Sequence, residues 1–213
     1  MNARTLTKPK PWILLPERIK AVVYIVGITP AVYAFYQVFN GQLGADPLKT
    51  LERLLGLWAL RFLIVGLAIT PLRKISGNAW NFVRYRRAIG LLAFFYALLH
   101  VVVYVWLDQD FNLAAIWKDL VKRPYITVGM LAFTILIPLA ITSNSTMIKR
   151  LGAATWQKLH KWVYLAAAAG CLHFILLQKR WPPEPLVYAA ITASLLLWRV
   201  WDAKTKPART PRV

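Results

Sequence analysis

The three histidines of this 213-residue chain are its clearest candidates for chemistry, because all three lie in or beside long apolar stretches. His100 is embedded in AIGLLAFFYALLHVVVYVWL, and His160 and His173 share WQKLHKWVYLAAAAGCLHFILL. An ionisable side chain costs free energy in hydrocarbon, so its presence within a membrane-spanning segment indicates a function. His100 precedes Asp108, the next charged residue, by eight positions, and His173 precedes Lys179 by six. If both segments cross a membrane in the same direction, these two imidazoles lie at one depth and can share a metal ion.

Two imidazoles at one depth are the ligand set of a bis-histidine haem in an electron-carrying membrane protein. Zinc fits less well, because it takes three or four protein ligands and no cysteine or acid lies at that depth. The single cysteine, Cys171, excludes an internal disulfide and an iron–sulfur cluster. The simpler alternative is that each histidine only forms a hydrogen bond with a neighbouring helix. We therefore expect a metal site formed by His100 and His173, with hydrogen bonding alone as the alternative.

His160 lies 13 residues before His173, a rise of about 20 Å along a helix. Thirteen residues before His100 the chain has Arg87 instead of a histidine. At the depth of His160, near the cytoplasmic edge, there is therefore only one imidazole. Thirteen residues turn a regular helix by roughly 220°, so His160 and His173 do not share a face unless tilt or a π-bulge within residues 166–170 realigns them. His160 is accordingly either a further ligand or an interfacial histidine flanked by lysines.

The apolar stretches that carry these residues predict an all-α membrane bundle. Hydrophobic residues make up 58% of the chain, mean hydropathy is +0.48, and charged residues fall to 16%, below the share usual in soluble domains. Six stretches are long enough to span a membrane: roughly 18–39, 51–71, 87–107, 125–142, 155–178 and 185–201. Turn-forming clusters such as NGQLGADP and LDQDFN separate them. Residues 1–213 are expected to form a single six-helix transmembrane domain without a soluble catalytic domain.

The net charge of +19 follows the expected topology of the chain. Seventeen basic residues and two acids lie in the N-terminal segment, the second and fourth loops and the C-terminal tail. The other three loops hold seven basic residues and six acids. Basic loops remain on the cytoplasmic side, which predicts that both termini are cytoplasmic. Because topology accounts for the charge, we expect membrane lipid around the chain and no nucleic-acid partner.

Four arginines could bind anions. Arg61 interrupts the apolar run LLGLWALRFLIVGLAIT, so its guanidinium should face the bundle and bind either a haem propionate or a cluster of carbonyl groups. Arg84, Arg86 and Arg87 precede the His100 segment and could bind the phosphate of a flavin or nucleotide. The alternative for these three is an ordinary cytoplasmic basic cluster.

Four motifs carry a resemblance to a known family: ITPLR (69–73), RRAIGLLAFFYALLH (86–100), LAITSN (139–144) and WQKLHKWVYL (156–165). In this order across six spans they resemble the MsrQ family, a branch of the ferric-reductase-like transmembrane group, over essentially the whole chain. The resemblance implies a haem b (heme b) held by His100 and His173, with His160 as a further or alternative ligand, and FMN binding. Compared with four-histidine ferric reductases, the chain lacks one inner ligand and a fused FAD/NADPH domain.

The same resemblance implies a place in the bacterial cell inner membrane and a partner. The partner is the periplasmic molybdopterin enzyme MsrP, which reduces methionine sulfoxide in oxidised periplasmic proteins, and the implied donor is the quinone pool or a cytoplasmic flavin reductase. We therefore expect an electron-transfer subunit in which cofactors carry the electrons and the bundle sets their position and potential. The alternative is a proton-coupled transporter with a histidine relay, which would need acids within the membrane, whereas all eight acids lie at span ends or in loops.

Overall fold

The computed structural model describes residues 15–76, 82–178 and 182–205, and its regular elements in these ranges are all helical. The long helices are α1 (Leu15–Phe39), α2 (Pro47–Ile75), α3 (Arg86–Val102), α5 (Pro124–Ile141), α8 (Val163–Leu176) and α9 (Pro183–Thr205). The short elements are η2 (Phe82–Tyr85), the π-helix η3 (Val103–Asp108), α4 (Leu113–Lys122), α6 (Ser145–Leu151) and α7 (Ala153–His160). With η2 and η3 extending α3, and α7 joined to α8, six segments are long and apolar enough to cross a membrane. The prediction of an all-α bundle with six spans is confirmed.

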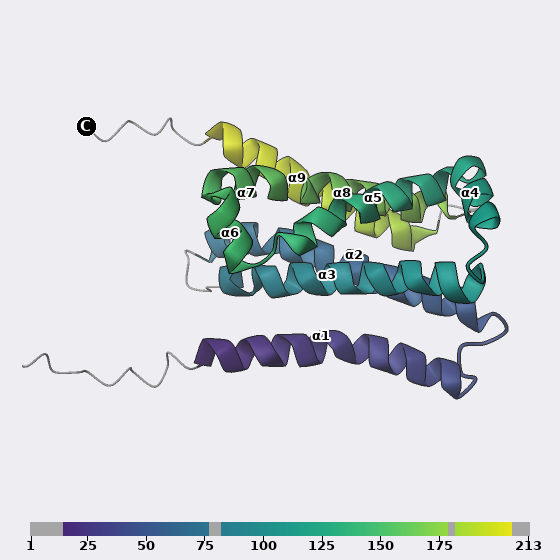
Figure 1. The fold of residues 1–213 in the computed structure, drawn as a ribbon. Coiled ribbons are helices and arrows are strands. Elements are labelled where there is room, and N and C mark those ends of the chain that lie inside the picture. Colours follow the sequence, from purple (N-terminus) through teal and green to yellow (C-terminus); the bar gives the residue numbers. More distant parts are fainter. Residues whose placement is uncertain (1–14, 77–81, 179–181, 206–213) are drawn as a thin grey trace, which may run out of the picture.

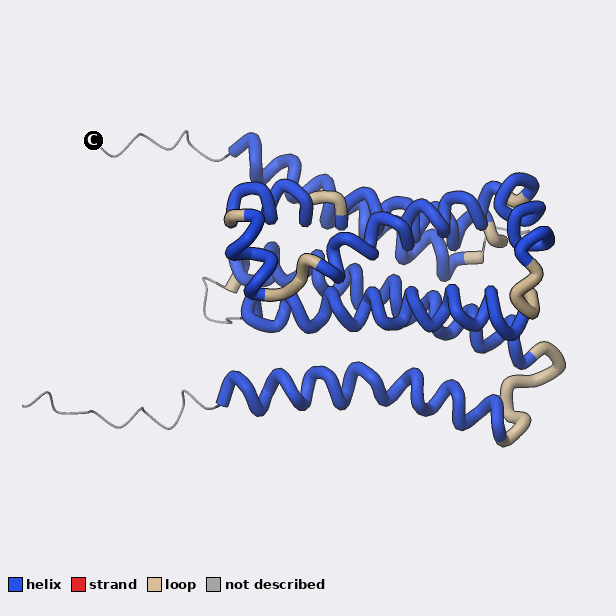
Figure 2. Tube along the Cα trace, in the orientation of Figure 1, coloured by secondary structure: helices blue, strands red, loops and turns tan. Residues whose placement is uncertain are grey.

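The spans lie side by side, and successive spans run in opposite directions (Figure 1). The start of α1 and the end of α9 lie at the same end of the bundle, together with α6 and α7 (Figure 1). We call this the basic end, because it carries Arg86, Arg87, Lys149, Arg150 and Lys158. The short helix α4 lies at the opposite end, and the tube in Figure 2 shows that the connections between successive spans lie toward the two ends.

The outer surface of the bundle is apolar, as a protein in contact with lipid requires. On α1, Ile25 is 68% exposed and Val26 is 63% exposed, and on α9 Leu197 is 69% exposed. A soluble monomer rarely exposes contiguous apolar surface of this kind. Together with the six apolar spans, this surface identifies a multi-pass membrane protein.

Polar and conformationally special residues begin and end the helices. The Asp46 side chain accepts a hydrogen bond from Lys49 N at the start of α2, and Asn112 caps α4 in the same way. Asn144 caps α6, and Gly152, with φ at 75°, separates α6 from α7. The predicted turns at NGQLGADP and LDQDFN are therefore confirmed, whereas the short helices α4 and α6 that follow turns were not predicted.

Tyr96 of α3 repairs an interruption in α1. Pro30 lies inside α1, where its ring removes one backbone donor and clashes with the preceding turn. The buried Tyr96 hydroxyl donates to Gly27 O at 2.7 Å and accepts from Ala31 N at 3.0 Å. These two groups would bond each other directly in an unbroken helix, so the hydroxyl bridges the interrupted turn and joins α1 to α3.

The centre of the bundle is formed by two helix pairs, α2 with α3 and α5 with α8. Leu63, Ala93, Leu136 and Ala166 contribute one residue from each helix to a single buried cluster. Ala93 and Ala166 are completely buried, and such small residues allow helix backbones to approach closely. The helices that carry His100 and His173, α3 and α8, are therefore held in tight contact with α2 and α5.

The fifth span is interrupted between its two histidines. α7 ends at His160, residues 161–162 form a turn, and α8 begins at Val163. Of the two ways considered to realign these histidines, a π-bulge within residues 166–170 is absent, because α8 is regular α-helix there. The π-helical segment is η3, immediately after the other histidine-bearing helix, and the turn at 161–162 is what changes the helical register between His160 and His173.

Candidate functional site

His100 of α3 and His173 of α8 meet inside the bundle. Their ring centroids are 6.1 Å apart and their planes are inclined at 75°. A metal–imidazole bond of about 2 Å and a further ~1 Å from nitrogen to ring centre place two ligand rings roughly 6 Å apart across one metal ion. The structure thus brings together the two histidines that the sequence paired, at a separation suited to two ligands of one metal ion.

Both imidazoles are fixed through Nδ1 by a backbone carbonyl of an adjacent helix. His100 Nδ1 lies 2.8 Å from Glu52 O, and His173 Nδ1 lies 2.6 Å from Tyr125 O. Because a carbonyl can only accept, each Nδ1 carries the proton, and Nε2 of a neutral ring then presents a lone pair. Among the described residues neither Nε2 has a hydrogen-bond partner. Hydrogen bonding to a neighbouring helix therefore accounts for one nitrogen of each ring and leaves the other suited to a metal.

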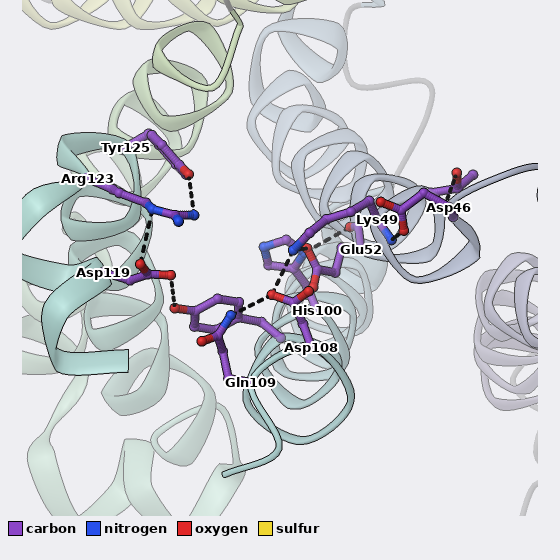
Figure 3. A network of polar contacts seen from close by, with 11 residues as sticks. Asp46, Lys49, Glu52, His100, Asp108, Gln109, Asp119, Arg123 and Tyr125 are labelled. Atoms are coloured by element: carbon purple, nitrogen blue, oxygen red, sulfur yellow. Dashed lines mark hydrogen bonds and ion pairs between the residues drawn. The ribbon is translucent and has the colours of Figure 1, made fainter. Parts of the chain in front are cut away.

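The residues that supply these carbonyls are anchored at the end of the bundle opposite the basic end (Figure 3). On the α2 side, Lys49 Nζ contacts Glu52 Oε2 at 3.3 Å and Asp108 Oδ2 at 2.7 Å. Lys49 thereby ties the start of α2 to the end of the π-helix that follows His100. These contacts hold the carbonyl of Glu52 and the helix of His100 in register.

A second chain of contacts anchors the α5 side (Figure 3). Tyr104 donates to Asp119 Oδ2 at 3.2 Å, Arg123 Nε pairs with Asp119 Oδ1 at 3.0 Å, and Arg123 Nη1 donates to the Tyr125 hydroxyl at 3.2 Å. The hydrogen bond to Tyr125 raises the pKa of Arg123, which keeps this guanidinium charged. The network therefore connects η3, α4 and the residue whose carbonyl holds His173.

His160 lies apart from this pair, near the basic end. Its Nε2 is 3.1 Å from Thr142 Oγ1, and its ring stacks on Trp156 with centroids 3.9 Å apart. The Trp156 indole in turn donates to Thr142 O at 2.9 Å. The part of the chain described by the structure brings no second histidine to His160, and it contains no group of three or more His, Cys, Asp or Glu side chains suited to a metal.

Arg61 faces the bundle, as expected, but its partners are aromatic. Its Nε donates to the Tyr188 hydroxyl at 2.7 Å, and its guanidinium lies 4.9 Å from the centre of the Trp58 ring. The expected carbonyl cluster is replaced by one phenolic oxygen and one indole face. The propionate alternative stays a prediction.

The three arginines at the start of the His100 helix differ in exposure and in their neighbours. Arg84 is exposed over the Tyr85 ring at 5.9 Å, Arg87 is exposed, and Arg86 is half-buried. Arg86 and Arg87 lie within electrostatic range of His160, which places positive charge beside the inner histidine. Their prediction as a phosphate site stays open, since a basic pair at a helix start suits either an anion or a membrane surface.

Sequence reasoning missed the groups that hold the paired imidazoles. A backbone carbonyl has no signature in a sequence, and the ion pairs around Glu52 and Tyr125 join residues from different loops. One signal was available: Gly56 and Gly129 each lie four residues after the residue whose backbone carbonyl accepts the imidazole hydrogen bond.

Six spans around two facing histidines define a helical membrane protein with a two-imidazole site. Residues 55–171 match the family described as ferric reductase like transmembrane component. The chain is 53% identical over 194 residues to "Protein-methionine-sulfoxide reductase heme-binding subunit MsrQ" of Brucella ovis, across 90% of this chain and 87% of the relative. Proteins of the same name from Brucella anthropi and Brucella canis show the same identity and coverage. The chain belongs to the MsrQ family of ferric-reductase-like transmembrane proteins.

Proposed function

We propose that this protein is the haem b-binding electron-transfer subunit of a methionine-sulfoxide reductase system in the bacterial inner membrane. The observation that carries the proposal is the 6.1 Å separation of the His100 and His173 rings, with both Nδ1 atoms engaged and both Nε2 atoms available. The relatives are named heme-binding subunits, which supports haem as the bound group. When bound, a haem iron accepts and releases one electron at a time.

The role of the surrounding residues is to fix the ligands and set their electronic properties. A hydrogen bond from Nδ1 to a carbonyl selects the tautomer with a free Nε2 and raises the basicity of the ring as a ligand. The apolar helices around His100 and His173 limit water access and lower the local dielectric constant, which tunes a reduction potential. The chain itself makes and breaks no covalent bond of the substrate.

We propose that electrons enter at the basic end and leave at the opposite end. The positive-inside rule supports a cytoplasmic basic end, because the described loops and helix ends there carry Arg86, Arg87, Lys149 and Arg150. The donor in this proposal is the quinone pool or a cytoplasmic flavin reductase, and the acceptor is the periplasmic enzyme MsrP. The paired histidines lie toward the MsrP side, so the electron leaves the molecule from the site that is closer to its acceptor.

The inner histidine and the arginines belong to the entry side in this proposal. His160, bound to Thr142 and stacked on Trp156, is either a further ligand or a residue on the path from the donor. Arg84, Arg86 and Arg87 supply positive charge at the start of the His100 helix, which suits the phosphate of FMN. Arg61, held by Tyr188 and Trp58, stabilises the bundle from within and contributes a partly buried positive charge.

An absorption spectrum of the purified protein tests the central proposal. We expect a Soret band that shifts on reduction with dithionite, and a pyridine haemochrome spectrum of b type. The control is the double variant His100→Ala/His173→Ala, which should lose the low-spin haem. Protein that inserts correctly under haem-replete expression and contains no haem would overturn the proposal and leave the transporter alternative.

A further inference from the structure

The two helix pairs around the histidine site repeat one another at a constant offset of 73 residues. Glu52 and Tyr125 supply the carbonyls, Gly56 and Gly129 follow one turn later, and the paired histidines come 48 residues after the carbonyls. α2 and α5 run in the same direction through the bundle, and so do α3 and α8 (Figure 1). The α2–α3 pair and the α5–α8 pair are therefore equivalent units, each of which contributes one imidazole.

The buried core obeys the same offset. Leu63 and Leu136 are equivalent positions, as are Ala93 and Ala166, and all four lie in one cluster. Equivalent residues that meet one another indicate an approximate two-fold axis between the units, as in an isologous interface between subunits. His100 and His173 also meet each other, so the histidine site lies at this axis.

The glycines are where each imidazole lies against the neighbouring helix. A Cβ added to Gly129 would lie 2.7 Å from Nδ1 and 3.0 Å from Cε1 of His173. A Cβ added to Gly56 would lie 3.4 Å from Nδ1 and 3.5 Å from Cε1 of His100, which is an ordinary contact. Each ring thus rests on bare backbone and reaches the carbonyl one helical turn earlier. Any side chain at Gly129 would push the ring away from Tyr125 O, whereas at Gly56 only a side chain larger than alanine would crowd the ring of His100.

We propose that Gly56 and Gly129 are positioning residues of the paired-histidine site. Their missing side chains let each imidazole bind a main-chain carbonyl through Nδ1 and direct Nε2 toward a shared metal at the axis. The inference rests on the proposed haem function and adds the reason why the two ligands are held in equivalent ways. A substitution at Gly129 should disturb the site more than one at Gly56, because a Cβ at Gly129 would lie closer to the imidazole.

The test is a set of glycine-to-alanine variants in the full-length protein. Gly129→Ala displaces the His173 ring and weakens its hydrogen bond to Tyr125 O, which lowers ligand basicity. We expect a 10–100-fold loss of haem affinity, the range typical for a lost outer-shell partner, a mixed-spin spectrum and a raised midpoint potential. Gly56→Ala should shift the potential in the same direction by less and keep a low-spin spectrum.

Two other glycines provide matched controls. Gly66 lies on the same helix as Gly56, and Gly170 lies three residues before His173. In Gly66→Ala and Gly170→Ala the added Cβ would make only an ordinary contact, at 3.7 Å. Both controls should keep the spectrum and potential of the unmodified protein. If Gly129→Ala does not accumulate in the membrane, Gly56→Val replaces it, because its larger side chain must displace the His100 ring. We then expect a potential shift in Gly56→Val that Gly66→Val does not show, and equal shifts in the two variants would overturn the proposal.

The outcomes separate this inference from the proposed function. Unmodified protein without haem would contradict the haem function and the inference together. Unmodified protein with a low-spin haem, accompanied by Gly129→Ala and Gly56→Ala variants of unchanged spectrum and potential, would overturn the positioning role alone. Equal potential shifts in all four alanine variants would also overturn it, because general helix packing would then be the cause.

Discussion

His100 and His173 each bind, through Nδ1, the backbone carbonyl of the residue 48 positions earlier, on a different helix. The two rings face one another with centroids 6.1 Å apart. Neither ring therefore depends on its own helix alone for its orientation, and the carbonyls of Glu52 and Tyr125 contribute as much to the site as the histidines themselves. Variants that remove the rings, the inner histidine or the basic residues should consequently have separable effects.

Removal of either paired histidine should abolish the low-spin haem. In His100→Ala or His173→Ala one axial nitrogen is missing, and a site built from two imidazoles cannot form a six-coordinate bis-histidine complex. Pyridine haemochrome quantification and the visible spectrum of purified protein measure the loss. Retention of a full complement of low-spin haem in either single variant would show that the two rings do not share a metal.

Replacement of His160 should have a different result. His160→Ala removes the ring that stacks on Trp156 and binds Thr142, but leaves both groups that hold the paired histidines. We expect the bis-histidine spectrum to persist and reduction from the cytoplasmic side to become slower, as measured by stopped-flow absorbance with a flavin-reductase donor. A complete loss of haem with the fold intact would identify His160 as a member of the essential ligand pair.

The charge distribution predicts the orientation of the bundle. A periplasmic phosphatase fused after Val213 should be inactive, and the same enzyme inserted in the loop at Gly41 should be active, because the basic end is retained in the cytoplasm. Membrane fractionation with both fusions provides the measurement, and comparable expression of the two is the control. Phosphatase activity at Val213 would reverse the proposed direction of electron flow.

Arg86 and Arg87 should bind FMN if they form a phosphate site. A charge-assisted hydrogen bond contributes about 1.5–3 kcal/mol, so Arg86→Ala/Arg87→Ala should lower FMN affinity by at least roughly tenfold and slow donor-driven reduction. Dithionite, a small diffusible reductant, should still reduce the haem. Lys149→Ala/Arg150→Ala removes equal charge from the same end of the bundle and serves as the control. If both double variants keep full FMN content and donor-driven reduction, these arginines only determine topology.

The Tyr96 hydroxyl should stabilise the contact between α1 and α3. Tyr96→Phe leaves Gly27 O and Ala31 N without the group that bridges them, and an unsatisfied buried polar group costs about 1–3 kcal/mol. Thermal unfolding in detergent should therefore begin at a lower temperature, with the haem spectrum unchanged before unfolding. Tyr36→Phe is the control because Tyr36 is exposed, and equal stability of the two variants would contradict a bridging role.

The six spans could be read from the sequence because the requirement is local. A helix that crosses a bilayer needs about 20 apolar residues, and a run such as residues 125–142 meets it without reference to any other part of the chain. The observed segment, Pro124–Ile141, differs by one residue at each end. The common depth of the two histidines was also visible, since it follows from counting residues to the next charge.

The partners of the functional side chains could not be read in this way. Which residue a side chain meets depends on the rotation and spacing of neighbouring helices, and close packing at Ala93 and Ala166 sets both. Arg61 accordingly meets Tyr188, and His160 meets Thr142, although each pair comes from distant parts of the chain.

Residue type and spacing along the chain determined that this is a membrane protein, how many spans it has and which two histidines pair. The length of an apolar segment and the depth of a residue within it can both be counted along the sequence. Contacts between helices fixed the facing geometry of His100 and His173, their carbonyl partners and the need for Gly56 and Gly129. A carbonyl group and an absent Cβ carry no chemical label in the sequence, and they acquire their role only when another helix brings an imidazole against them.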